Sequence, residues 1–180
     1  RIADFLDREV SIIDLLFKAR KEQVFLAEER YKCWLSELVV PGISRSVSRS
    51  KRWPWLPEEV ELVKLGWVAR LQSGVTVDSS RTHSPDDMEY PYLRVANVQG
   101  EKIDLSEIKT IRVSPAMAKR SMLLYGDVVM TEANGNPDNL GRGCVWRGEV
   151  PNMIHQNHVF AIRVNREVLV PEYLSLVLAS

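Results

Sequence analysis

Apolar residues recur every three or four positions along the first part of the chain. No Pro or Gly interrupts this pattern between Ala3 and Leu38, and alternating steps of three and four are typical of a coiled-coil seam. A helix of this length would run roughly 50 Å, and few small domains could bury it alone. We therefore predict a long helix over residues 1–42 that packs against another helix. Its predicted interface consists of Leu6, Val10, Ile13, Phe17, Val24, Ala27, Tyr31, Trp34 and Leu38.

The pattern changes in the stretch "PGISRSVSRSKRWPW", which begins at Pro41. Pro and Gly are typical of the end of a helix, and the residues that follow are rich in Ser and basic. Residues 43–55 are therefore predicted to be a linker, with positive charge on Arg45, Arg49, Lys51 and Arg52. Such charge either contacts phosphates or is simply solvated, and the sequence leaves both interpretations open.

Residues 56–180 consist of short apolar runs separated by turn residues, which is typical of strands. The predicted strands are "VELVKLGWVARL", "YPYLRVANV", "EIKTIRV", "DVVMTEA", "GCVW" and "HVFAIRV". Two short helices are predicted to begin at Ser114-Pro115 and at Pro171, because Pro is favoured at the first helical position. The predicted fold class is α+β: a long coiled-coil helix followed by a mixed, strand-rich domain.

Composition excludes several settings. The chain has 24 basic and 24 acidic residues, so its overall charge indicates neither nucleic acid nor a membrane surface. Cys33 and Cys144 lie far apart and offer neither a disulfide framework nor a metal spacing. No signal core and no run of about 18 apolar residues is present. We expect a reducing, cytoplasmic setting, and the lack of an initiating Met indicates that the chain begins inside a longer polypeptide.

Motifs of catalysis are incomplete throughout. The phosphate loop G-x-x-x-x-G-K-[ST] is absent, and the glycines at Gly141 and Gly143 lack the context of a dinucleotide-binding fold. The loop "NPDN" at residues 136–139 lacks the aromatic platform that holds a flipped base. Neither Pro-Asp pair is followed by the further residues of a metal-dependent nuclease. We expect this chain not to be an enzyme.

A metal site is also not expected. His155 and His158 are three positions apart, so on a strand they would point to opposite faces. No third ligand stands nearby in the sequence, and zinc requires three or four. Structural or hydrogen-bonding roles are favoured for both histidines.

The remaining polar residues are of the types that read base edges. Asn and Gln pair with adenine, Arg pairs with guanine, and Thr contacts the thymine methyl group. Many of them lie in Gly- and Ser-rich loops, where turn chemistry alone also explains them; others lie at predicted strand positions, where buried cross-strand hydrogen bonds are the alternative. The candidate DNA-binding residues are Thr76, Arg81, His83, Arg94, Asn97, Asn134, Asn136, Asn139, Arg142, Gln156 and Asn157.

Three long blocks carry a resemblance to a known family. The blocks "YPYLRVANVQGEKIDLSEIKTIRVS", "LLYGDVVMTEANGNPDNLGRGCVW" and "PNMIHQNHVFAIRV" closely resemble the target recognition domain of specificity subunits from type I restriction-modification systems. The start, "RIADFLDREVSIIDLL", resembles that family's conserved spacer helix. The resemblance implies a spacer helix over 1–42 and a target recognition domain over 56–180, whose C-terminal part and closing helix are expected to be missing.

The resemblance also implies partners. In that family each recognition domain reads half of a bipartite site in double-stranded DNA, and two helices pair to set the spacing. The subunit docks methyltransferase subunits and, through them, restriction subunits. S-adenosylmethionine, ATP and Mg are used by those partners, so no cofactor is expected on this chain. Its helix is expected to pair with a second helix of the same subunit or with another copy of the chain.

Two further hypotheses stay open. A non-catalytic coiled-coil assembly module would oligomerise without any sequence-dependent affinity for DNA. A diverged nuclease or methyltransferase domain would turn over DNA or S-adenosylmethionine. The first measurement that separates them is selection of bound duplexes from a random pool.

Overall fold

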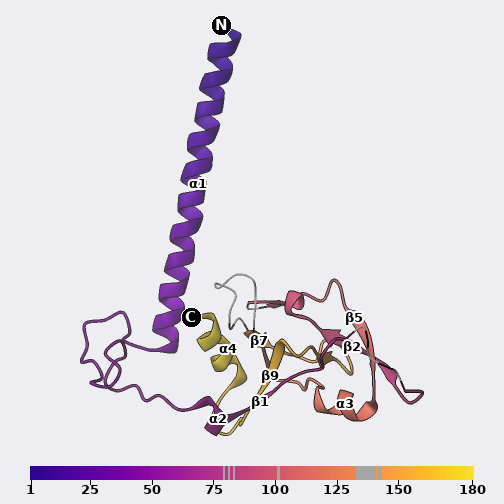
Figure 1. Ribbon diagram of the computed structural model, residues 1–180. Coiled ribbons are helices and arrows are strands. Elements are labelled where there is room, and N and C mark those ends of the chain that lie inside the picture. The colour runs from indigo at the N-terminus through magenta and orange to yellow at the C-terminus, as the bar shows by residue number, and fades with distance from the viewer. Residues whose placement is uncertain (79, 81, 83, 101, 133–140, 142) are drawn as a thin grey trace. The chain divides into compact units, whose positions relative to one another are not determined.

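The structure is a computed structural model that describes residues 1–78, 80, 82, 84–100, 102–132, 141 and 143–180. The chain divides into two compact units, Arg1–Val60 and Glu61–Ala179, and both are drawn in Figure 1. The first unit is a helix with a loop, and the second contains the strands. The predicted α+β class, with a long helix before a strand-rich region, is confirmed.

Helix α1 spans Ile2–Val39 without a break, as the uninterrupted apolar pattern predicts. Only Leu35 and Val39 are buried along its length. Three residues beyond the end of the helix, Gly42 adopts a positive φ of 87°, a conformation that a residue with a side chain adopts only with strain. No helix in the described part of the chain is long and apolar enough to cross a membrane.

The segment after α1 folds back on itself as a small antiparallel hairpin, residues 48–58, which we call the basic hairpin. Arg49 pairs with Pro57 in an antiparallel bridge, and the Ser50 amide donates to the Leu56 carbonyl at 2.9 Å. Leu56 is almost fully buried at 1% exposure. Residues predicted as a linker thus have defined backbone pairing of their own.

The described residues of the unit Glu61–Ala179 form three sheets and three short α-helices. Its strands are β1 Ala69–Gln72, β2 Met88–Leu93, β3 Val98–Gln99, β4 Lys102–Ile103, β5 Lys109–Val113, β6 Val128–Thr131, β7 Gly143–Val145, β8 Ile154–His155 and β9 Val159–Val164. Its helices are α2 Leu65–Val68, α3 Pro115–Arg120, α4 Pro171–Ala179 and the 3-10 helix η1 Val95–Asn97. The predicted helix starts at Pro115 and Pro171 are both confirmed.

The central sheet has the strand order β1-β9-β6-β7, and both of its faces are covered. Val128 and Ile162 are paired across β6 and β9 and pack with Leu174 of α4. The next residues along these strands, Val129 and Ala161, point to the opposite face and join a second core. Because alternate residues point to opposite faces of a strand, one sheet serves two apolar cores.

A second sheet, in the order β5-β2-β8, packs with α3. Tyr92 of β2 pairs with Ile154 of β8, and both belong to a core that includes Ala118 of α3. The hydroxyl of Ser114 accepts a hydrogen bond from the Met117 amide at 3.3 Å, so Ser114 is the N-cap that the sequence predicts. The third sheet is the short pair β3-β4.

Two predicted strands are partly wrong. The stretch "VELVKLGWVARL" is a strand only from Ala69 onward, because β9 offers partners only to Ala69–Gln72, and α2 precedes it. Residues 95–97 form the 3-10 helix η1 rather than a strand. There the Asn97 side chain hydrogen-bonds backbone groups, and such bonds compete with a strand ladder.

Candidate nucleic-acid interface

The turn between β8 and β9, residues 156–158, joins three parts of the chain that are far apart in sequence. The Asn157 amide donates to the Val75 carbonyl at 2.9 Å. The Gln156 amide donates to the Leu93 carbonyl at 2.9 Å, and the Glu132 amide donates to the His158 carbonyl at 3.0 Å. Val75 precedes one predicted DNA-binding loop and Glu132 precedes the other, so the turn holds the starts of both loops together.

Polar side chains occupy this turn. The Asn157 amide nitrogen lies 3.4 Å from Nε2 of His158, whose Nδ1 lies 3.1 Å from Oε2 of Glu132. His158 and Glu132 are each about half exposed. Gln156 is partly buried, and its side chain forms no hydrogen bond with the described residues. These groups can donate hydrogen bonds to a ligand and accept hydrogen bonds from it. Base-pair edges are such a ligand, because they present both donors and acceptors.

Gln156 and Asn157 were predicted at strand positions, and the structure places them differently. Gln156 forms an isolated parallel bridge with Val75, and Asn157 lies in the turn itself. The short strand β8 ends at His155 because residues 156–158 must reverse the chain into β9.

His155 lies beneath the turn and is completely buried. Its Nδ1 hydrogen-bonds the Val159 carbonyl across the turn, and its Nε2 has no partner among the described residues. Burial lowers the pKa of His155 below its usual value, although hydrogen bonds to Val159 and Gln156 oppose the shift. The imidazole is therefore neutral at pH 7 and ties the two ends of the turn together.

Gly74 makes this arrangement possible by its lack of a side chain. A Cβ added at Gly74 would lie 2.0 Å from the His155 carbonyl oxygen and 2.5 Å from that of Gln156. Only glycine permits the backbone before Val75 to approach β8 so closely. The candidate interface thus depends on a backbone contact that the sequence analysis did not single out.

Arg94 and Asn97 have structural roles in the second unit. Asn97 is 4% exposed; its oxygen accepts from the Arg94 amide, and its nitrogen donates to the carbonyls of Asp104 and Glu107. The Arg94 guanidinium donates to the Glu107 carbonyl at 2.9 Å and pairs with the Glu107 carboxylate at 3.4 Å. Asn97 thus forms buried hydrogen bonds within the protein, which was the alternative to a DNA contact, and both hydrogens of its side-chain amide are in use.

Several predicted residues lie outside the part of the chain that the structure describes. Thr76, the first residue of its loop, is described, is exposed and takes part in an interaction. Glu132 and Gly141 border the other loop, and the Gly141 amide donates to the Thr131 carbonyl at 3.3 Å. The predicted residues outside the described part are Arg81, His83, Asn134, Asn136, Asn139 and Arg142.

A second polar site was missed by the sequence analysis. Asp127, 1% exposed, accepts two hydrogen bonds from the Arg163 guanidinium at 2.8 and 2.7 Å and a third from the Leu124 amide. This fork raises the pKa of Arg163. The two residues are 36 positions apart, and no local motif marks the pair, so only the fold brings them together.

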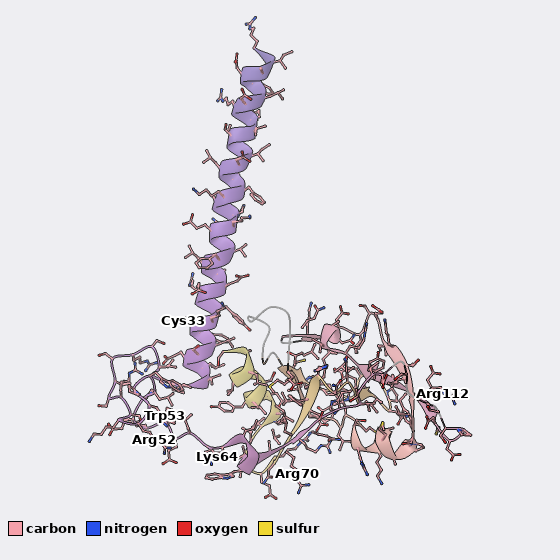
Figure 2. All side chains as sticks on the ribbon, viewed as in Figure 1. Cys33, Arg52, Trp53, Lys64, Arg70 and Arg112 are labelled. Carbon is pink, nitrogen blue, oxygen red and sulfur yellow. The ribbon has the colours of Figure 1, made fainter. Side chains whose placement is uncertain are left out.

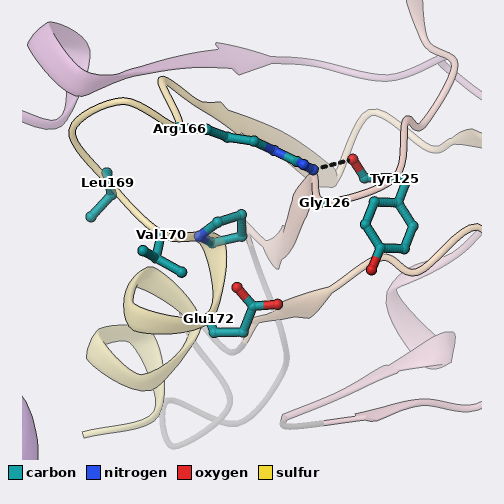
Figure 3. A pocket seen from close by; sticks show the side chains of 7 residues that line it. Tyr125, Gly126, Arg166, Leu169, Val170 and Glu172 are labelled. Carbon is teal, nitrogen blue, oxygen red and sulfur yellow. Dashed lines mark hydrogen bonds between the residues drawn. The ribbon is translucent and has the colours of Figure 1, made fainter.

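Beside this pair lies a cavity of about 290 Å³. Figure 3 shows Arg166 reaching across Gly126 to the carbonyl oxygen of Tyr125, at 2.7 Å. The Arg166 guanidinium also lies 5.7 Å from the Tyr125 ring centroid, and Glu172 on the far wall pairs with Arg147 at 3.7 Å. The cations of this cavity are thus engaged by protein groups. Among the described residues no cluster of His, Cys, Asp and Glu could hold a metal ion.

The predicted helix interface is exposed along α1. Ile13 and Phe17 are each 62% exposed and Trp34 is 60% exposed. The other members are exposed as well: Leu6, Val10, Val24, Ala27, Tyr31 and Leu38. Its pairing with a second helix stays a prediction.

Comparisons with known proteins give relatives of one kind. No family model matches the chain. The chain is 24% identical, over 99% of its length, to the specificity subunit of the type I restriction enzyme EcoKI from Escherichia coli, of which the match spans 37%. It is 21% identical, over 66% of its length, to the putative specificity subunit of the type I restriction enzyme MjaX from Methanocaldococcus jannaschii, of which the match spans 27%.

Two solved structures are also similar. The HsdS subunit from Thermoanaerobacter tengcongensis matches 88% of this chain and 36% of its own at a TM-score of 0.43 and 15% identity. A chain from a study of assembly and conformational transition of a type I restriction-modification system matches 95% of this chain and 39% of its own, at a TM-score of 0.47 and 16% identity. The two curated relatives confirm the resemblance that the sequence blocks carry: this chain is similar, over about a third of their length, to specificity subunits of type I restriction enzymes.

Proposed function

We propose that this chain is a DNA-reading segment of a type I restriction-modification specificity subunit. The unit Glu61–Ala179 reads one half of a bipartite site in double-stranded DNA, and α1 pairs with a second helix and sets the distance between the halves. The chain docks methyltransferase subunits and, indirectly, restriction subunits, and it acts in the cytoplasm. It has no catalytic role; S-adenosylmethionine, ATP and Mg belong to the partner subunits.

The observation that carries this proposal is the convergence at residues 156–158. Loops that begin at Thr76 and after Glu132 start side by side because Val75 and Glu132 both hydrogen-bond this one turn. Binding residues commonly lie on loops held by a rigid scaffold. Val75, Ile154 and Val159 are at most 4% exposed around the turn, so the scaffold is packed while the loop starts face outward.

Selection of bound duplexes from a random pool tests the proposal, with the chain in complex with its methyltransferase subunits at near-physiological salt. Enrichment of a short fixed block is expected. If the complex forms and no block emerges, the chain is an assembly module, and the exposed apolar face of α1 accounts for it. Turnover of DNA or S-adenosylmethionine by the purified chain alone would instead favour a diverged enzyme.

Point variants sharpen the test once a site is selected. Gln156→Ala is expected to weaken binding to the selected duplex by about 1–3 kcal/mol, as for a lost base contact, and to leave random duplex unaffected. Arg142→Ala, at a position outside the described residues, is expected to act in the same way. Gln99→Ala is the matched control, because Gln99 is exposed on β3 and its side-chain amide, as far as the described residues go, hydrogen-bonds only the Ala96 carbonyl. An equal loss on selected and random duplex would assign the residue to phosphate contact.

A further inference from the structure

The basic hairpin belongs to the first unit and follows the predicted helix interface of α1 in the sequence. The hairpin contains three basic residues, Arg49, Lys51 and Arg52, against one acidic residue, Glu58, and a fourth basic residue, Arg45, precedes it. In Figure 2 the labels of Arg52 and Trp53 mark neighbouring side chains of this segment. The hairpin presents Lys51 and Arg52 at its tip, both exposed.

Arg49 and Arg45 are both engaged by other groups of the first unit. The Arg49 guanidinium donates to the carbonyls of Ile43 at 2.9 Å and Arg45 at 2.7 Å, and lies 3.5 Å from that of Trp55. Arg45 pairs with Glu37 of α1 at 3.2 Å. These cations are already engaged, so their charge holds the backbone and leaves the tip in a fixed shape.

Glu37 anchors the same segment to the end of α1. Its carboxylate accepts hydrogen bonds from the amides of Gly42 and Ser44 at 2.8 and 3.1 Å, and from the Ser44 hydroxyl at 2.6 Å. A loop fixed by so many side-chain-to-backbone bonds loses little conformational entropy when a ligand binds.

The tip differs from the brace because its cations have no carboxylate partner. Neither Lys51 nor Arg52 has an ion pair among the described residues. The Arg52 guanidinium lies 5.5 Å from the Trp53 ring centroid, which orients it without neutralising it. Trp55, 58% exposed, adds a second exposed aromatic ring further along the same hairpin.

We propose that the tip of the basic hairpin, Lys51 and Arg52, is a sequence-independent contact for the phosphate backbone of duplex DNA, separate from the surface that reads bases. This inference rests on the proposed function for its ligand. Adjacent cations on a preformed, uncharged backbone loop suit phosphate groups, whose neutralisation releases counterions. The exposed aromatic ring suits the sugar that lies between phosphates.

The test uses the full chain and a random-sequence duplex, with affinity measured across a range of salt concentrations. Each phosphate contact contributes about 0.9 to the slope of log K against log salt, so Lys51→Ala/Arg52→Ala is expected to reduce the slope by about 2. At 0.15 M salt this corresponds to about a 30-fold loss of affinity. The loss on a selected duplex is expected to be equal.

The matched control is Lys119→Ala/Arg120→Ala, because these residues are the same adjacent pair, exposed at the end of α3 in the other unit. It removes the same charge and is expected to change the slope little. If both double variants reduce the slope equally, only general charge acts and the proposal is overturned. If the Lys51→Ala/Arg52→Ala variant loses assembly with the methyltransferase subunits and keeps its slope, the hairpin contacts protein and the proposal is likewise overturned.

A second variant tests the brace without changing charge. Arg49→Lys keeps a cation but cannot reproduce the fork of donors to several carbonyls. Affinity for random duplex is expected to fall several-fold although net charge is unchanged; unchanged affinity would contradict the fixed tip. If no sequence is selected but Lys51→Ala/Arg52→Ala still reduces the salt slope on random duplex as expected, the base-reading function is contradicted and the phosphate contact is supported.

Discussion

In the unit Glu61–Ala179 the apolar side chains at the centre of the main sheet, on β6 and β9, are buried or partly buried, whereas along α1 side chains of the same kind face outward. Val128 and Ile162 expose none of their surface, but Ile13 and Phe17 of α1 are each 62% exposed. The strand-rich unit therefore owes its order to burial between residues distant in sequence. The helix owes its order to local backbone hydrogen bonds.

This difference teaches what each unit needs. A helix in a protein gains most of its stability from packing of its apolar face, and the sequence predicts a second helix as the partner of α1. Its C-terminal loop is held by polar braces, Glu37 and Arg49, rather than by a large core. The second unit has three apolar clusters among its described residues, so the two units should respond differently to the same substitution.

The largest difference is expected from shortening a buried side chain. Ile162→Ala removes atoms from a closely packed position and should lower the free energy of unfolding of the second unit by about 2–5 kcal/mol. Ile13→Ala is the matched change on α1 and should alter that unit's stability by less than about 0.5 kcal/mol. Amide hydrogen exchange measures both, from peptides of β6 and β9 for Ile162→Ala and from peptides of α1 for Ile13→Ala. Equal loss of protection in the two variants would contradict the comparison.

A smaller effect is expected from Asp127→Asn. The substitution keeps the size of the side chain but removes the charge that holds the Arg163 fork, and its NH2 group faces either Nε of Arg163 or the Leu124 amide, both of which are donors. Because the Arg163 side chain is 40% exposed, solvent weakens the pair, and a loss of about 1–3 kcal/mol is expected. Urea unfolding measures it, with Asp86→Asn as the control, since Asp86 is exposed. If Asp127→Asn leaves the free energy of unfolding unchanged, the ion pair between Asp127 and Arg163 contributes little to stability.

Acid is expected to act on the second unit through His155. Burial lowers its pKa in the folded state, an effect that the nearby charge of Arg163 supports and that of Asp127 opposes. The stability that depends on the neutral form is complete above the unfolded value of about 6.5 and is lost as the pH falls below it. The slope is at most about 1.4 kcal/mol per pH unit for one proton. His155→Asn should flatten this slope; if stability between pH 7 and pH 5 follows the same curve in both proteins, His155 is not the cause.

Much of this comparison was predictable from local sequence, but the buried polar contacts were not. An unbroken apolar repeat predicted α1, and Pro at the first helical position predicted α3 and α4. These signals are local, and no long-range contact overrides them. The 3-10 helix at residues 95–97 was missed because the capture of backbone groups by the Asn97 side chain depends on Asp104 and Glu107.

The candidate interface follows the same division. Gln156 and Asn157 were predicted as DNA-binding residues from their residue types. No sequence pattern, however, shows that Val75 and Glu132 hydrogen-bond the same turn. Nor does a pattern predict that Gly74 packs on the His155 carbonyl. Such contacts join residues tens of positions apart, and only the fold determines them.

The smallest expected effect lies at the end of α1 and tests whether polar braces alone hold the basic hairpin. Hydrogen bonds from the Ser44 hydroxyl and from the amides of Gly42 and Ser44, with the charge of Arg45, lower the pKa of Glu37 to about 2. Since this value lies below the ordinary 4.5, the contribution of the carboxylate is complete above about pH 4.5 and is lost as the pH falls towards 2.

Glu37→Gln should reproduce the acid state at neutral pH. The Gln side chain keeps one acceptor oxygen but loses the ion pair with Arg45. Faster hydrogen exchange is therefore expected at the backbone amides of Gly42 and Ser44, and unchanged exchange at β6 and β9. Glu29→Gln, which loses only an exposed pair with Lys32 on the same helix, should leave those two amides unchanged. Unchanged exchange in Glu37→Gln would show that Arg49 suffices as the brace. Because the proposed phosphate contact needs a fixed tip, Glu37→Gln should also weaken random-duplex binding slightly, even though removing a negative charge alone would strengthen it.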